Sequence, residues 1–424
     1  MAAALERQRA AREMGRAKAR CADGGGQGGG EERKAEAEDF AKAGDVPMRL
    51  AKPEWVLAPP DDLAGSWMCA ARPAGGRVLA VAARGATTLR GRNGARMGVV
   101  RTPLPGGGGA EDRRTRGATI LDCIRDAATG ELHALDVLVW NGHDMRTCAF
   151  EMRHFWLAAR LAELSDSIVV DDDAGGGGNA DDAMDCGSGE GPAVRIVALP
   201  FLPATQDAVE AAVVHAAKHS RAEYGREPAT DGVLFQHRLA WYASDAVTPL
   251  SLVWKDDATS AWYVETPPRG TPANAQRVVL RYDMKSGALL TSDDPPVRIA
   301  RLVARDGDAV DVVAVDTSDE APPTLIADGA LVRIDIFDDG ADVAMDDGRE
   351  GFRRMRFVGV LSGKHRASAT ADIASKISFQ HAARTGTGVT AADLIAAAAD
   401  ALLAPPDTAT AAAMDAMGDA LAAM

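Results

Sequence analysis

The segments Asp231-Gly-Val-Leu-Phe-Gln-His237 and Thr248-Pro-Leu-Ser-Leu-Val-Trp254-Lys-Asp-Asp257 decide the fold prediction for this chain. Both contain short apolar runs, which are typical of buried strands. A third segment, Ala82-Ala-Arg-Gly-Ala-Thr87, lies far upstream at the end of another apolar run. We predict that the first two segments form a pair of strands.

The three segments resemble motifs of the covalent nucleotidyltransferases, which include RNA-capping enzymes and ligases. The first motif of that family is Lys-x-Asp-Gly, and the later ones are approximately Glu-Gly-Leu-Val-Phe and Leu-Leu-Lys-Trp-Lys. On this chain the nucleophilic lysine falls on Ala82, whereas Lys255 keeps a late basic position. Because a methyl group cannot form a phosphoramidate, we expect a nucleotide pocket with no catalytic residue.

A wider resemblance covers residues 49–257. It includes Pro53-Glu-Trp55, Asp62-Leu-Ala-Gly-Ser-Trp67 and Leu135-Asp-Val-Leu-Val-Trp-Asn-Gly-His143, in this order and spacing. Together these stretches resemble the snurportin family, import adaptors that bind the trimethylguanosine cap of spliceosomal small nuclear RNAs. The longer C-terminal part is similar to the plant and green-algal branch of that family.

Charge is distributed unevenly along the 424 residues. The net charge of −14 argues against indiscriminate nucleic-acid binding, because phosphate backbones are held mainly by Lys and Arg. From Arg72 to Arg125, however, the chain has eleven arginines and only three acidic residues, Glu111, Asp112 and Asp122. Such a basic island in an acidic protein favours a small anionic ligand.

Composition and targeting patterns indicate a soluble chain with no membrane partner. The sequence has no run of 18 apolar residues and no signal-peptide pattern, and its five cysteines lack close paired spacing. We therefore expect reduced thiols, no zinc site, no cofactor, and a location in the cytoplasm and nucleus.

We predict an α+β fold with nucleotidyltransferase-like antiparallel sheets and packed helices, followed by a smaller OB-like β-domain. Helices are expected at 151–164, with its aromatic residues in the core, and at 205–224. The OB-like prediction depends on short strands expected at 261–265, 277–282, 297–303, 309–315, 330–337 and 354–361. The predicted parts are a basic arm and linker at 1–48, a cap-binding domain at 49–268 with a disordered acidic insertion at 165–192, the β-domain at 269–385 and an alanine-rich helical tail at 386–424.

The resemblance implies particular cap-binding residues. Methylation at N7 makes guanine cationic, so an aromatic face attracts it with about 0.5 to 2 kcal/mol. Trp254 matches the stacking tryptophan of the family, and Trp55 matches a second tryptophan at the pocket edge. Arg77, Arg92 and Lys255 are the expected cations for the triphosphate bridge.

Metal binding and catalysis are two alternative functions for these residues. Asp231 and Asp122 lie where catalytic relatives carry metal-binding carboxylates, but without a nucleophile we expect no metal. His215 and His219 are four residues apart on a predicted helix, and a solvated pair is expected. A rival interpretation is an active guanylyltransferase or ligase whose nucleophile lies elsewhere, for example Lys255.

The N-terminal stretch is short and basic. In the resembling family the corresponding arm binds importin beta, which implies that this segment is an import signal, with an exportin for recycling. A cap reader without an import role stays open as a third interpretation, because this arm is shorter and less basic than the family pattern. The residues of the implied importin site are Arg7, Arg9, Arg12, Arg16, Lys18 and Arg20.

Overall fold

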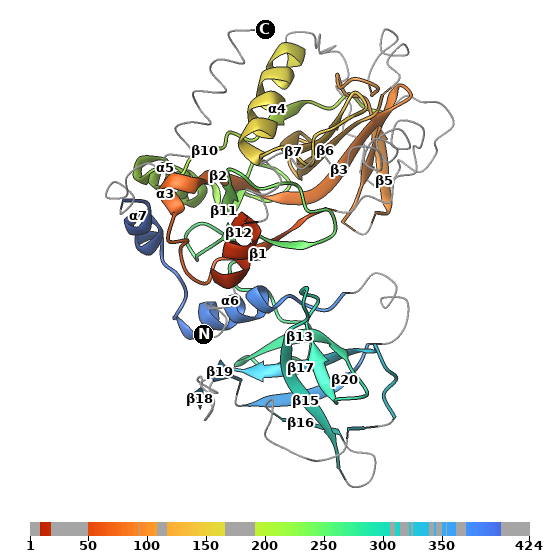
Figure 1. Ribbon diagram of the computed structural model, residues 1–424, viewed down its shortest axis with the longest axis vertical. Coiled ribbons are helices and arrows are strands. Elements are labelled where there is room, and N and C mark those ends of the chain that lie inside the picture. The colour runs from red at the N-terminus through yellow and green to blue at the C-terminus, as the bar shows by residue number, and fades with distance from the viewer. Residues whose placement is uncertain are drawn as a thin grey trace.

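The computed structural model describes residues 9–17, 50–92, 94–107, 117–165, 191–305, 310–313, 322–323, 325–338, 343–344, 350–352, 354–361 and 370–399. Most of the predicted acidic insertion and most of the predicted tail lie outside these residues. The described chain forms three larger sheets, mainly antiparallel, with packed helices, which confirms the α+β class. Two of the sheets form the upper part of the molecule in Figure 1, and the third forms the lower part.

The first sheet contains the two segments that decide the fold prediction. They form the antiparallel strands β11 and β12, with Val233 opposite Trp254, so the predicted strand pair is confirmed. β1 joins the far edge of β12 in the parallel direction. The strand order is β1 (Lys52–Trp55), β12 (Val247–Trp254), β11 (Thr230–His237), β2 (Trp67–Pro73) and β10 (Leu202–Pro203).

The second sheet contains the Ala82 segment. β3 and β4 form a hairpin whose turn places Arg84 and Gly85 at positive φ, which accounts for the glycine there. The apolar runs at 78–83, 119–124 and 132–140 lie in β3, β6 and β7. The order is β5 (Arg96–Val100), β4 (Ala86–Arg90), β3 (Gly75–Ala83), β6 (Thr119–Asp126), β7 (Leu132–Trp140) and β8 (His143–Asp144), with β9 (Ile196–Ala198) parallel to β7.

Helix α4 (Phe150–Ser165) covers the second sheet but not with the residues we expected. Its buried apolar residues are Phe150, Leu157 and Leu161, whereas Phe155 is 67% exposed. The prediction that the aromatic residues of this helix lie in the core was wrong for Phe155 and Trp156. A second apolar stripe on the same helix, spaced by seven and four residues, packs against the sheet instead.

Helix α5 (Gln206–His219) covers the outer face of the first sheet. It begins after Thr205, whose hydroxyl accepts a hydrogen bond from the Ala208 amide, and it ends earlier than predicted. α7 (Ala391–Ala399) packs against α5 and the short helix α3 (Leu63–Ser66). The start of the predicted tail therefore contributes to the core of this sheet.

The third sheet lies in the C-terminal part and includes five of the six predicted strands. Residues 261–264 form turns and bends instead, and the Glu265 amide donates to the Gln380 side chain. The edge strands β16 and β20 contact each other, so the sheet is strongly curved. The assignment of this part as an OB-like domain stays a prediction. The order is β16 (Val310–Val313), β15 (Arg298–Ala304), β14 (Ala288–Leu290), β13 (Ala275–Tyr282), β17 (Leu331–Phe337) and β20 (Met355–Val360), with β18 (Val343–Ala344) paired to β19 (Glu350–Gly351).

Helix α6 (Ala374–Thr385) lies between the upper and lower parts and contacts β1 and β13 (Figure 1). Within the described residues, no helix is both long enough and apolar enough to cross a membrane.

Candidate functional site

A carboxylate at one end of the first sheet gathers two cations. Asp231 accepts hydrogen bonds from Lys255, at 2.5 Å from Nζ, and from the Arg72 guanidinium. The Ser260 hydroxyl donates to the same Asp231 oxygen at 2.6 Å. The three strand ends that carry these charges, from β2, β11 and β12, are neighbours in the sheet.

A β-bulge directs Asp231 toward this cluster. The register between β11 and β2 shifts between Thr230 and Val233, and Gly232 has a φ of 88°. A Cβ atom at Gly232 would lie 2.3 Å from the Trp254 carbonyl oxygen, so only glycine is accommodated. The Asp-Gly pair of the first quoted segment is therefore needed to turn the carboxylate toward Arg72 and Lys255.

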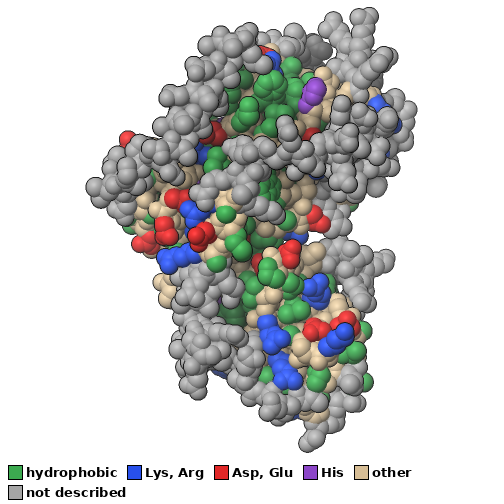
Figure 2. Space-filling view, viewed as in Figure 1, with side chains coloured by type: hydrophobic (Ala, Val, Ile, Leu, Met, Phe, Trp, Pro, Cys, Tyr) green, Lys and Arg blue, Asp and Glu red, His purple; other side chains and the backbone are tan. Residues whose placement is uncertain are grey.

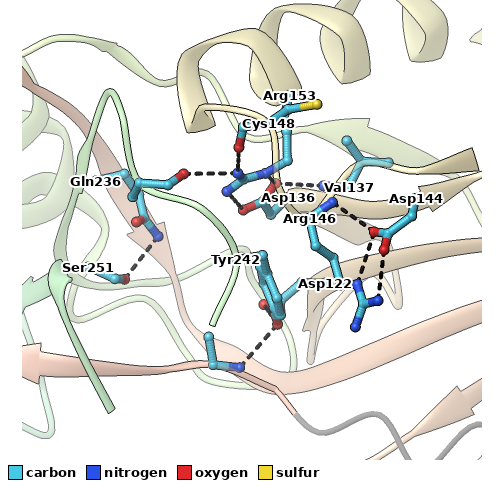
Figure 3. Close-up of polar contacts among 12 residues, drawn as sticks. Asp122, Asp136, Val137, Asp144, Arg146, Cys148, Arg153, Gln236, Tyr242 and Ser251 are labelled. Carbon is cyan, nitrogen blue, oxygen red and sulfur yellow. Dashed lines mark hydrogen bonds and ion pairs between the residues drawn. The ribbon is translucent and has the colours of Figure 1, made fainter. Parts of the chain in front are cut away.

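A second ion pair lies on the facing side of the second sheet. Arg77 on β3 donates to both oxygens of Asp122 on β6, at 2.9 and 2.5 Å. The Tyr242 hydroxyl donates to Asp122 at 2.7 Å and accepts the Ala51 amide at 3.1 Å. Figure 3 shows the Tyr242 and Asp122 side chains meeting near the Asp136–Arg153 pair. Asp122 is therefore fixed from both sides.

The two ion pairs belong to one charged region. The charges of Arg77 and Arg92 both act on Arg72, and those of Arg77 and Asp122 act on Arg92. We call Arg72, Arg77, Arg92 and Lys255 the cation site. These four cations face the two carboxylates Asp122 and Asp231, so this set keeps an excess of positive charge.

Burial and pairing change the pKa values in the cation site. Burial lowers the pKa of Lys255 and of Arg72, although Asp231 opposes both shifts. Burial also acts to lower the pKa of Arg77, but its ion pair and hydrogen bonds with Asp122 raise the pKa above its usual range. An incoming anion would offset the desolvation and the mutual repulsion of these cations.

Arg92 differs from the other members of the site. It is exposed, and among the described residues it has no carboxylate partner within ion-pair distance. Protein atoms nevertheless surround enough of its guanidinium to lower its pKa, and the Arg77 charge acts in the same direction. Arg92 is thus the cation best able to reach a ligand.

Trp55 lies beside Lys255. The Lys255 ammonium is 5.4 Å from the centroid of the Trp55 ring. The same ring lies 4.7 Å from Phe379 of α6, and the Trp55 amide donates to the Ser375 hydroxyl at 3.2 Å. Lys255 and Phe379 therefore already contact this ring.

Trp254 lies apart from the cation site. Its exposed fraction is 0%, and its indole Nε1 donates to the Val389 carbonyl at 2.8 Å. It packs in the core beneath α5 and α7, with Leu394 among its neighbours. Because side chains alternate along a strand, Val253 and Lys255 point to the other face of β12. This placement does not fit the predicted stacking role, since no face of the Trp254 ring is open.

Ala82 is buried on the face of β3 opposite to Arg77. It belongs to the core beneath α4, together with Val78 and Ala80. A Cβ atom at Gly107 would lie 2.6 Å from the Ala82 Cβ, so the loop that contains Gly107 closes the space beyond Ala82. A longer side chain at position 82 would point into this core and away from the cation site.

The helix of residues 9–17 carries part of the predicted importin site and contacts the first sheet domain. Arg12 is 3% exposed, and burial lowers its pKa to about 10. Arg12 lies 3.4 Å from the Ala58 carbonyl, and Arg16 donates to Asp62 at 2.7 Å. Acidic and basic side chains lie next to one another on the face shown in Figure 2. Arg7, Lys18 and Arg20 lie outside the described residues.

The remaining predicted or rejected sites hold no metal cluster within the described part of the chain. His215 and His219 are neighbours, with ring centroids 4.8 Å apart, but no third ligand joins them there.

Arg72 was not among the predicted site residues, although it belongs to the basic island of the sequence. Its place beside Asp231 depends on the pairing of β2 with β11, which no local sequence pattern indicates.

The fold and the site define a class of protein: an α+β chain in which two mainly antiparallel sheets hold a cluster of arginine and lysine side chains between them. Residues 49–172 match the family model described as Snurportin1, m3G cap-binding domain. The match includes Trp55 and three members of the cation site, and it ends before Trp254 and Lys255.

Solved structures of DNA ligases are among those that match this chain, at low identity and low TM-score. A mycobacterial DNA ligase D complexed with ATP and MES is 15% identical, with a TM-score of 0.30, over 76% of this chain and 98% of that one. A Chlorella virus DNA ligase-adenylate is 10% identical, with a TM-score of 0.29, over 75% of this chain and 100% of that one. TM-scores at this level support no conclusion about activity.

Proposed function

We propose that this chain binds the trimethylguanosine cap of small nuclear RNAs without catalysing a reaction on it. The observation that carries the proposal is the match of residues 49–172 to a cap-binding domain, because this range supplies Arg72, Arg77 and Arg92. A cap contains a triphosphate bridge, and arginine guanidinium groups suit phosphate oxygens in both charge and shape. Lys255 adds a fourth cation from outside the matched range.

The carboxylates of the site prearrange its cations. Asp231 holds Arg72 and Lys255, and Asp122 holds Arg77. Because these side chains are already ordered, a ligand that binds them loses little additional side-chain entropy. The cation site is a small positively charged region in an acidic chain, which favours a compact polyanion over a long duplex.

A covalent nucleotidyl intermediate is not part of this proposal. The family's nucleophile position is occupied by Ala82, whose side chain lies in the core. The rival enzyme interpretation is favoured by one observation, the lowered pKa of Lys255, since a less basic lysine is easier to deprotonate. Against it, the Lys255 ammonium is paired with Asp231, which favours the charged, non-nucleophilic form.

We further propose that the chain is an import adaptor that shuttles between cytoplasm and nucleus. Importin beta would bind the basic N-terminal segment, and an exportin would return the empty adaptor. Arg9, Arg12 and Arg16 support this idea by charge, because a basic helix suits an acidic receptor surface.

A gel-shift experiment tests the cap-binding proposal. One short RNA is prepared with either a trimethylguanosine cap or a 5′ triphosphate, so that both forms present the same sequence and phosphates at the 5′ end. The proposal predicts that the capped RNA shifts at a lower protein concentration than the triphosphate form. Equal shifts for the two RNAs would contradict it.

A further inference from the structure

Two exposed aromatic side chains meet at the protein surface close to the first sheet. Tyr224 is 53% exposed and Trp262 is 38% exposed, although rings of this size usually bury more of their surface. Their centroids are 5.1 Å apart and their planes are nearly perpendicular, at 77°. The two rings therefore form an open corner with one wall from each residue.

The aromatic corner is connected to the cation site by hydrogen bonds. The Trp262 amide donates to the Ser260 hydroxyl at 3.0 Å, and Ser260 donates to Asp231 at 2.6 Å. Asp231 is the carboxylate that holds Arg72 and Lys255. Tyr224 also lies near Arg72. The corner thus lies at the edge of the cation site.

Three other tryptophans have their rings engaged. Trp254 and Trp67 have no exposed surface, and the Trp55 ring contacts both Lys255 and Phe379. Among the described tryptophans that lie near the cation site, Trp262 has a partly exposed ring and is linked by hydrogen bonds to the phosphate-binding cations. Trp156 has similar exposure but lies on α4, where Arg160 stacks over its ring at 4.5 Å.

We propose that the Tyr224–Trp262 corner binds the N7-methylated guanine base of the cap while the cation site holds its phosphates. This inference rests on the proposed function and names the surface that reads the methylated base. A cationic ring stacks favourably on an indole face, and a second, perpendicular aromatic wall suits the methyl groups at the ring edge. Aromatic corners beside basic residues are also a recurrent means of holding single nucleotides.

The test compares Trp262→Ala with Trp156→Ala in the full-length protein. Each variant is titrated with a trimethylguanosine-capped dinucleotide and with its unmethylated counterpart, which has the same triphosphate bridge. Loss of one base–aromatic stack predicts that Trp262→Ala weakens binding of the methylated cap about 5- to 150-fold. The unmethylated ligand should lose clearly less, and Trp156→Ala should bind both as the wild type does.

Trp262→Phe keeps an aromatic face and should retain most of the affinity, which guards against an effect of misfolding. Tyr224→Ala should weaken binding of the methylated ligand by a smaller factor, because it removes only one wall of the corner. Wild-type affinity in Trp262→Ala, or equal losses for both ligands, would overturn this inference while leaving the cap-binding proposal intact. If the wild-type protein does not prefer the methylated cap, the proposed function itself fails.

Discussion

The Lys255 ammonium lies 2.5 Å from an Asp231 carboxylate oxygen, beside the bulge at the start of β11. Because Arg72 binds the other oxygen of Asp231, one carboxylate positions two cations from different strands. Breaking such a buried pair leaves an unpaired charge and is strongly destabilising, so alanine variants of these residues combine a binding effect with a folding effect. Cleaner tests use positions at which the structure tolerates the change.

Trp254→Ala should destabilise the protein rather than remove a ligand contact. The variant loses a fully buried indole and its hydrogen bond to Val389, so we expect the free energy of unfolding to fall by about 3 to 5 kcal/mol. Urea unfolding measures this loss, and Trp254→Phe should lose less because it keeps most of the ring volume. A Trp254→Ala protein that is fully stable yet unable to bind the cap would restore the stacking role.

Arg92→Ala should weaken phosphate binding without harming the fold, because the side chain is exposed. We expect the affinity for a capped dinucleotide to fall and its dependence on log salt to decrease by about one unit, as for one lost phosphate contact. Affinity for a methylated nucleoside without phosphates should not change. Arg96→Ala, a nearby exposed arginine on β5, serves as the control. Identical salt slopes for wild type and Arg92→Ala would exclude a phosphate contact.

Incubation with radiolabelled GTP or ATP and a divalent metal should leave no label on the denatured protein. Introducing a lysine by Ala82→Lys should not create labelling, because the new side chain would enter the core beside Gly107. We expect this variant to be destabilised by several kcal/mol, since it buries a charge. Stable label on the wild-type protein would favour the enzyme interpretation.

The N-terminal helix should bind importin beta less tightly within the full-length chain than as an isolated peptide of residues 1–20. In the chain, Arg12 is buried near Ala58 and Arg16 is paired with Asp62, so the helix must leave this surface to present both cations. Pulldown at low and high salt measures the difference, and both forms should weaken with salt. Deleting residues 1–20 should abolish the interaction and leave cap affinity unchanged. If importin beta retains the deletion variant as well as it retains the full-length protein, this segment has no import role.

Much of the fold could be predicted from local patterns. The apolar runs before Gly85 and around Asp231 and Trp254 gave the strands correctly, because a buried strand leaves a clear signal in sequence. Helix α4 was also predicted, but its buried face was not. The helix has two apolar stripes, and Leu157 rather than Phe155 is buried because of how the helix packs against the neighbouring sheet.

The candidate site was predicted in part. Arg77, Arg92 and Lys255 could be identified because they lie in or near recognisable motifs, and the structure brings them into one region. The position of Trp254 could not be predicted, because a single step along a strand moves a side chain to the other face of the sheet. The place of Arg72 depends on which strand lies next to β11, a contact between residues far apart in the sequence.

The most direct test of the central claim is the affinity of the wild-type protein for two dinucleotides that differ only in methylation of the cap. The account predicts a clear preference for the trimethylguanosine-capped ligand over unmethylated GpppG in a titration at fixed salt, since only the methylated base is cationic. Both ligands should also compete with each other, because they share the cation site. Equal affinity for the two ligands, or no measurable binding of either, would contradict the account.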